Sequence, residues 1–201
     1  SPYLGRTISV IMREPKFIVA VISSMFGYGI MSLVMTATPL AMKFCGFNFS
    51  ETATVIQLHA LAMFAPSFFT GHLIKRFGVF KIILVGIVFN LCCLGTNSLG
   101  VSFSNFVIGL VFLGLGWNFM FIGGTTLLTE VYSSTEKSRV QGIHDFIVFT
   151  VVTIFSFSAG FIQEFLGWFF VNLLIFVPMM VAFGAVSWFV FYKNEVKGGG
   201  V

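Results

Sequence analysis

Long apolar runs separated by short polar segments dominate the chain. Six runs reach the length of about 20 mostly apolar residues that a helix needs to cross a membrane. They lie at residues 17–42, 51–74, 80–98, 105–129, 140–164 and 168–192. Polar segments at residues 1–16 and 193–201 flank these runs. The pattern predicts an all-α membrane protein with six transmembrane helices.

Small and polar residues indicate where some of these helices begin. Ser50 is the expected N-cap of the second helix, because Glu51 follows it in the first turn, where a carboxylate is favoured. Gly78 and Gly167 mark the expected turns before the third and sixth helices.

The overall composition supports a membrane setting. Hydrophobic residues make up 57% of the 201 positions and charged residues only 9%, whereas soluble domains carry roughly 25% charged residues. A chain of this length cannot bury so much apolar surface in one core, so we expect the remainder to face lipid. The net charge of +4 would suggest nucleic-acid binding in a soluble protein, but here it more simply reflects membrane topology.

The lysines and arginines are strongly segregated between the two sides of the predicted membrane. One side carries Arg6, Arg13, Lys16, Lys75, Arg76, Lys81, Lys137, Arg139, Lys193 and Lys197. Lys43 alone lies on the other side. Because positive residues stay in cytoplasmic loops, both termini are predicted to be cytoplasmic.

The motifs of several enzyme classes are absent from the sequence. The chain has no phosphate-binding loop, no H-E-x-x-H and no G-x-S-x-G. Cys45, Cys92 and Cys93 fit neither a disulfide framework nor a zinc site. We therefore expect no catalytic residues, no cofactor, no metal and no nucleic-acid partner.

Glycines and basic residues recur between the second and third runs. Gly71, Leu73, Arg76, Gly78 and Lys81 follow the order G-x-L-x-x-R-x-G-x-x-K. Together with the six runs, this resembles the cytoplasmic signature of the major facilitator superfamily, which reads G-x-L-x-D-R-x-G-R-R/K in each six-helix half. The resemblance implies close helix approach at Gly71 and a tight turn at Gly78. Lys75 departs from the family pattern, because it stands where the family has Asp.

The resemblance continues in the segment TEVYSSTEKSRVQG, from Thr129 to Gly142. It is similar to the family's loop between the fourth and fifth helices of a half, with Glu130 closing one helix and Arg139 opening the next. By this resemblance, Arg76 pairs with Glu130 in one conformation and separates from it in the other, which makes a cytoplasmic latch.

The degenerate motif assigns the chain to one half of a transporter. Second-half copies of the motif are the more degenerate ones in the family, and the chain does not begin with Met. The resemblance therefore implies the C-terminal six-helix half, with a cytoplasmic linker at 1–16, the half-bundle at 17–192 and a cytoplasmic tail at 193–201. The implied partner is an N-terminal six-helix half.

Three further segments are similar to a bacterial branch of the superfamily, in which some members resemble riboflavin transporters. They read MTATPLAM, IQLHALAMFAPSFFTG and RVQGIHDFIVF. The resemblance implies secondary active transport of a small molecule across the cytoplasmic membrane by alternating access, coupled to an ion or substrate gradient.

Polar and aromatic residues inside the runs are candidates for a substrate cavity, because polar groups there usually face the bundle interior. At similar depth near the outer side lie Thr36, Thr38, Gln57 and His59. The alternative for His59 is an interhelical hydrogen bond. By family analogy the first and fourth helices line the cavity, which adds Tyr28, Met31, Met35, Trp117, Asn118 and Phe121. The alternative is that these aromatics fill gaps while nearby glycines make close helix contacts.

Two titratable groups are candidates for proton coupling. They are His59 and Asp145, which follows His144 at the start of the fifth run. Asp145 is alternatively a first-turn acid favoured by the helix dipole, or a partner of Arg139.

A different class of protein also fits the six runs. A complete six-span protein would act as a dimeric channel or scaffold, and a true Met start would favour it. A membrane-embedded enzyme would need a cluster of ionisable residues at one depth, which the runs do not contain.

Overall fold

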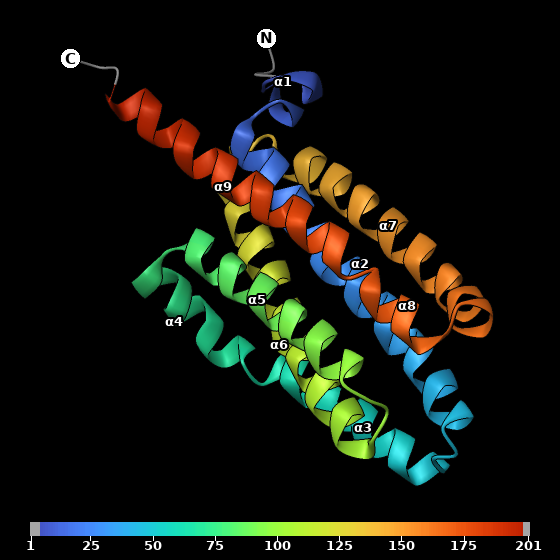
Figure 1. Ribbon diagram of the computed structural model, residues 1–201. Helices are drawn as coiled ribbons and strands as arrows, with labels where there is room; N and C mark the ends of the chain where they lie inside the picture. Colours follow the sequence, from blue (N-terminus) through green and yellow to red (C-terminus); the bar gives the residue numbers. More distant parts are fainter. Residues whose placement is uncertain (1–4, 199–201) are drawn as a thin grey trace.

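The computed structural model describes residues 5–198, with side chains up to residue 193, and its regular structure there is entirely helical (Figure 1). The helices are α1 Ile8–Met12, α2 Pro15–Phe44, α3 Phe49–Phe64, α4 Ser67–Phe77, α5 Val79–Ser98, α6 Phe103–Thr129, α7 Lys137–Phe165, α8 Gly167–Leu173 and α9 Phe176–Gly198. Residues 1–4 and 199–201 of the predicted linker and tail, and the side chain of Lys197, lie outside this description. The predicted all-α membrane fold is confirmed: five segments are long and apolar enough to cross a membrane, and the bent pair α3–α4, counted as one span, makes a sixth.

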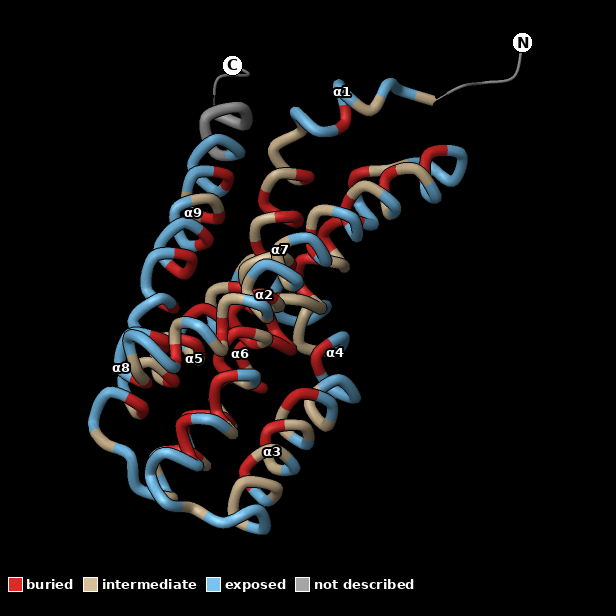
Figure 2. Tube along the Cα trace, turned by 90° about the vertical axis from the view of Figure 1, so that its right-hand side faces the viewer, coloured by how far each residue is buried: buried red, intermediate tan, exposed pale blue. Residues whose placement is uncertain are grey.

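Two long helices form the centre of the bundle. α2 and α6 pack side by side, α7 covers the far side of α2, and α3 covers α6 (Figures 1 and 2). α5 packs along α6, and α9 lies against both α2 and α5. In their most apolar stretches, 67% of the residues of α2 are buried but only 11% of those of α7. α7, at the flank of the bundle, is therefore covered on one face, where it packs on α2.

The second span is broken, contrary to the single helix predicted at 51–74. α3 ends at Phe64, α4 begins at Ser67, and the two segments meet at 40°. Pro66 lies at the break, where it has no N–H to continue the helical hydrogen bonds and its ring excludes a straight helix. Figure 1 shows α4 turning away from the line of α3.

The start of this span also differs from the prediction by two residues. Asn48, and not Ser50, is the N-cap, since its side chain accepts a hydrogen bond from the Glu51 N–H at 3.0 Å. The Asn48 N–H in turn donates to the Glu51 carboxylate at 2.9 Å. This capping box fixes where the helix begins.

The sixth span, predicted as one helix at 168–192, consists of α8 and α9. A short break at Leu174 and Ile175 separates them, and α9 continues to Gly198. Gly78 and Gly167 both adopt positive φ, at 91° and 81°, so the turns expected at these glycines are present.

Glycines allow α6 to pack closely against its neighbours. A Cβ atom at Gly114 would lie 2.8 Å from the backbone oxygen of His59 on α3. A Cβ at Gly86 of α5 would lie 2.9 Å from the backbone nitrogen of Met120 on α6. Small residues at such contacts let helix backbones approach, as is typical of membrane bundles.

Candidate functional site

Aromatic side chains from four helices meet beside the middle of α6. The rings of Trp117 and Phe121 are stacked with centroids 5.3 Å apart. Tyr28 of α2 lies edge-on to both, at 5.6 Å and 5.2 Å. Phe64 of α3 and Phe149 of α7 complete the group, 5.7 Å from Trp117 and 5.8 Å from Tyr28. We call these five residues the aromatic cluster.

The sequence had indicated three members of this cluster, and the structure brings those three together. Phe64 and Phe149 were missed, because nothing local distinguishes them among 28 phenylalanines. Met31 is buried in the core, and Met35 packs against it.

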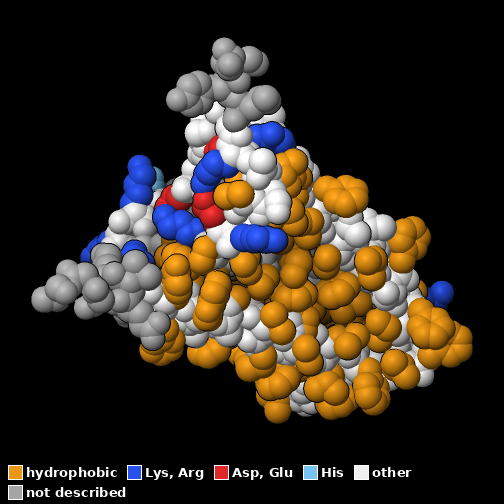
Figure 3. Space-filling model, turned by 90° about the horizontal axis from the view of Figure 1, so that it is seen from above, with side chains coloured by type: hydrophobic (Ala, Val, Ile, Leu, Met, Phe, Trp, Pro, Cys, Tyr) orange, Lys and Arg blue, Asp and Glu red, His pale blue; other side chains and the backbone are white. Residues whose placement is uncertain are grey.

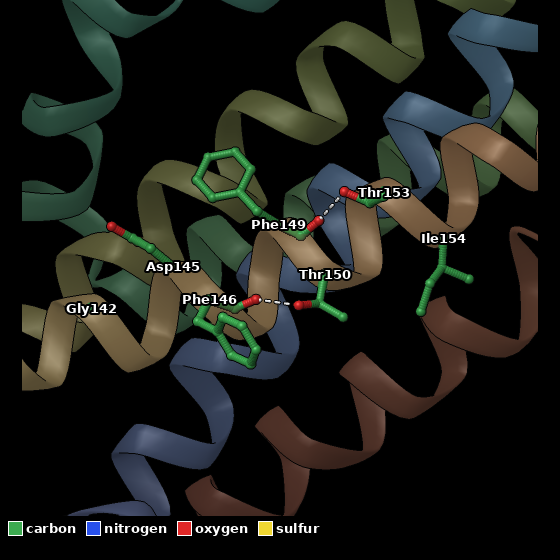
Figure 4. A pocket seen from close by; sticks show the side chains of 7 residues that line it. All are labelled: Gly142, Asp145, Phe146, Phe149, Thr150, Thr153 and Ile154. Atoms are coloured by element: carbon green, nitrogen blue, oxygen red, sulfur yellow. Dashed lines mark hydrogen bonds between the residues drawn. The ribbon is translucent and has the colours of Figure 1, made fainter.

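An open groove of about 520 Å³ lies beside the cluster along α7 (Figure 4). All seven of its lining residues come from this one helix: Gly142, Asp145, Phe146, Phe149, Thr150, Thr153 and Ile154. The hydroxyls of Thr150 and Thr153 donate to carbonyls of their own helix, each at 2.7 Å. Asp145 is therefore the one charged side chain among these seven lining residues.

Asp145 pairs with its neighbour, not with Arg139. Its carboxylate Oδ1 lies 2.9 Å from Nδ1 of His144, which is buried, while the Asp145 side chain is 60% exposed. Arg139 instead donates to the backbone oxygen of Arg6 at 3.0 Å.

Asn118 does not face a cavity, contrary to the sequence-based prediction. Its side chain is fully buried. Nδ2 donates to the Met63 oxygen and to Ser67 Oγ, both at 2.7 Å, and Oδ1 accepts from Thr70 Oγ1 at 2.6 Å. Asn118 thus bridges the break between α3 and α4, where the backbone alone leaves carbonyl groups without donors.

The outer candidates do not form a site in the described structure. His59 is buried and its Nδ1 bonds to the Leu110 oxygen at 2.8 Å, which is the interhelical alternative. Thr38 is buried and donates to Val34 of its own helix at 2.7 Å. Thr36 and Gln57 are exposed, and no hydrogen bond joins them to the other two among the described residues.

The cytoplasmic motif departs from the expected latch. Glu130 bonds to Lys16 Nζ at 2.8 Å, because the packing of α2 against α6 brings these side chains together, so the expected Arg76–Glu130 pair is not formed. Arg76 instead lies over the Phe77 ring at 5.2 Å. Gly71 is exposed and a Cβ there would meet no atom within 4 Å, so it makes no close helix contact. Leu73 is half-buried, and Lys75 and Lys81 are exposed.

A second acid in the loop after α6, which is not among the predicted site residues, makes several contacts with Arg6. Glu136 is buried and accepts from the backbone N–H of Arg6 at 2.7 Å and from its guanidinium at 3.0 Å and 2.8 Å. The bonds from Arg6 and from the Ser133 N–H lower the pKa of Glu136 well below its ordinary value. The side-chain hydrogen bond between Arg6 and Glu136 also raises the pKa of Arg6. This pair fastens the segment before α2 to the loop between α6 and α7.

The chain is similar in sequence to several bacterial membrane transporters. It is 43% identical to the riboflavin transporter RfnT of Brucella anthropi, over 86% of this chain and 43% of that protein. Two uncharacterized MFS-type transporters of Bacillus subtilis, YddS and YdeG, are 33% and 34% identical over 59% of this chain, and each match covers 28% of the relative. No family model matches the chain. The chain spans less than half the length of these relatives, and the comparisons confirm its resemblance to half of a major facilitator superfamily transporter.

Proposed function

We propose that this chain, a relative of major facilitator superfamily transporters over most of its length, is the C-terminal half of a secondary active transporter. It would move a small molecule across the cytoplasmic membrane by alternating access, with both termini in the cytoplasm. The observation that carries the proposal is the 43% identity to a named transporter over 86% of the chain. The segregation of lysines and arginines supports the orientation.

Two uncovered surfaces favour a second half as partner. Along α7, Phe157 is 83% exposed, and along α4, Phe68 is 80% exposed. α7 packs on α2, and α4 packs on α5 and α6. α7 and α3 each contribute a phenylalanine to the aromatic cluster, and the α7 groove lies beside it. A partner half resting on α7 and α3–α4 would enclose that groove and convert an open wall into a cavity.

The aromatic cluster suits a flat ring system as substrate. Stacked and edge-on aromatic faces bind planar ligands, and one carboxylate beside them can accept hydrogen bonds from polar edges. Riboflavin is the first compound to consider, because a relative bears its name. Asp145 would exchange the coupling proton, since it lines the groove and its side chain is exposed.

Uptake of labelled riboflavin by cells that produce the protein tests this proposal. Replacing Trp117 by Ala removes one face of the cluster, so we expect uptake to fall roughly tenfold, as for the loss of an aromatic pair and its buried area. Trp188→Ala is the matched control, because Trp188 lies on the exposed face of α9 and stacks on Tyr192.

A different experimental result would contradict each part of the proposal. Uptake equal to that of cells without the protein would exclude riboflavin. Unchanged uptake by Trp117→Ala at equal protein amount would remove the aromatic cluster from the substrate path. A tenfold loss with Trp188→Ala would mean that loss of any tryptophan disables the protein.

A further inference from the structure

We propose that the groove between the start of α5 and the end of α9 binds an anionic phospholipid. The site lies away from the α7 groove and does not depend on the proposed substrate. Its walls are Phe77, Gly78, Phe80, Lys81, Leu84, Phe189, Val190 and Lys193, and its volume is about 490 Å³.

The mouth of this groove is positively charged. Lys81 of α5 and Lys193 of α9 stand on opposite sides of it, and both side chains are exposed. Neither lysine forms an ion pair with any described side chain. Two ammonium groups beside one opening attract a phosphate group, and basic pockets between transmembrane helices are suited to anionic lipid headgroups.

The interior of the groove is apolar. The rings of Phe80 and Phe189 are stacked with centroids 5.0 Å apart and join α5 to α9 beside the lysines. A second groove of about 260 Å³ continues along the same two helices, lined by Leu84, Ile87, Val88, Leu91, Met180 and Phe183. Leu84 lines both grooves, so they adjoin along α5, and we call the two together the furrow.

The dimensions of the furrow match one leaflet of a bilayer. From Lys81 to Leu91 the axis of α5 advances about 15 Å at the usual rise per residue. The hydrocarbon core of a bilayer is about 30 Å thick, so the furrow spans half of it. A charged mouth at one end and an apolar channel of leaflet length fit the headgroup and acyl chain of a phospholipid.

The position of the mouth agrees with the charge distribution of the whole molecule. Figure 3 views the end of the bundle near both termini, where Lys, Arg, Asp and Glu side chains gather while hydrophobic side chains cover most of the rest. The mouth lies at this end, since Lys81 follows the α4–α5 turn and Lys193 lies close to the C-terminus. A headgroup here would sit at the level where the protein surface changes from polar to apolar.

Lipid titration of the purified, delipidated protein tests the site. Phosphatidylglycerol or phosphatidylcholine is added in detergent, and bound lipid is counted by native mass spectrometry. We expect tighter binding of phosphatidylglycerol, and the paired change Lys81→Gln and Lys193→Gln should weaken it roughly 30-fold, as for two basic residues near a phosphate. Lys137→Gln, an exposed lysine at the start of α7, is the matched control and should leave binding unchanged.

A change in the apolar part of the furrow separates lipid binding from simple anion binding. Val88 is exposed and lines the second groove, so Val88→Trp places a large ring there. The change should weaken the binding of both lipids although both lysines are still present. Glycerophosphoglycerol, the headgroup without acyl chains, should not compete with phosphatidylglycerol.

Three results would overturn the proposal. They are equal affinity for the two lipids, unchanged phosphatidylglycerol binding in the lysine variant, and competition by the free headgroup at the same concentration as the lipid. If the lysine variant fails to fold, the comparison of the two lipids on the unmodified protein and on Val88→Trp decides the question.

Discussion

Replacing Asn118 by Leu removes the side chain that bridges the broken second span. Leucine has nearly the same volume and suits the buried position, so the change isolates the hydrogen bonds. Three bonds are lost: two that Asn118 donates, to the Met63 oxygen and Ser67 Oγ, and one that it accepts from Thr70. Thr70 keeps its bond to the Pro66 oxygen at 2.9 Å, whereas the Met63 carbonyl loses the donor that Asn118 supplies.

The size of the effect follows from these three bonds. A polar contact between membrane helices is worth about 0.6 kcal/mol on average, and a buried hydrogen bond up to about 1.5 kcal/mol. Three bonds therefore stabilise the α3–α4 junction by about 2 to 4.5 kcal/mol. A local opening of α4 would become roughly 30- to 1,600-fold more populated.

Hydrogen exchange of the purified protein measures the local opening of α4 directly. In Asn118→Leu, the backbone amides of Ser67–Phe77 should exchange faster by the factor above, while those of α5 change little. Thr125→Val on the same helix is the matched control, since Thr125 donates only to carbonyls of α6 itself, at 2.9 Å and 3.1 Å. Equal exchange rates in Asn118→Leu and Thr125→Val would refute the bridging role of Asn118.

Three other results are expected from the contacts described. Because the pKa of Glu136 is lowered in the folded protein, its bonds to Arg6 contribute stability above the ordinary value of 4.5 and lose it as the pH falls below that value. In thermal unfolding, the melting temperature of Glu136→Gln should thus lie below that of the unmodified protein, by more at pH 7 than at pH 4. The same difference in melting temperature at both pH values would contradict this. Gly114→Ala should destabilise the protein by about 1–3 kcal/mol in a denaturant titration, because its Cβ would meet a backbone oxygen of α3 at 2.8 Å, whereas Gly160→Ala, with no atom within 4 Å, should be neutral or stabilising. Cys45 is exposed at the end of the first span opposite the basic loops, so a membrane-impermeant maleimide should label it in intact cells, and labelling only after lysis would reverse the proposed orientation.

The helical spans could be predicted from sequence because the signal for them is local. Each span is an apolar run, and the composition alone requires lipid around it. The break at Pro66 was missed although the proline is visible, because a proline in a membrane helix bends it only as far as neighbouring groups satisfy the freed backbone. Here that group is Asn118, which lies far along the chain.

Pairings between distant segments could not be predicted for the same reason. The loop after α6 contains two acids, Glu130 and Glu136, and the sequence gives no sign of which one Arg6 contacts. That choice depends on α1 folding back onto this loop. Similarly, Tyr28 and Trp117 were candidates because the family resemblance places the first and fourth helices at the cavity, whereas Phe149 joins them only through the packing of α7 on α2.

Counterflow in proteoliposomes tests the central claim of alternating-access transport most directly. Vesicles that contain the protein are loaded with unlabelled riboflavin and diluted into a trace of labelled riboflavin. A carrier that exposes its site to one side at a time should accumulate label transiently above the outside concentration, because returning sites are occupied by unlabelled substrate. Entry of label that only approaches the outside concentration would indicate a channel, and no entry would contradict transport of this compound.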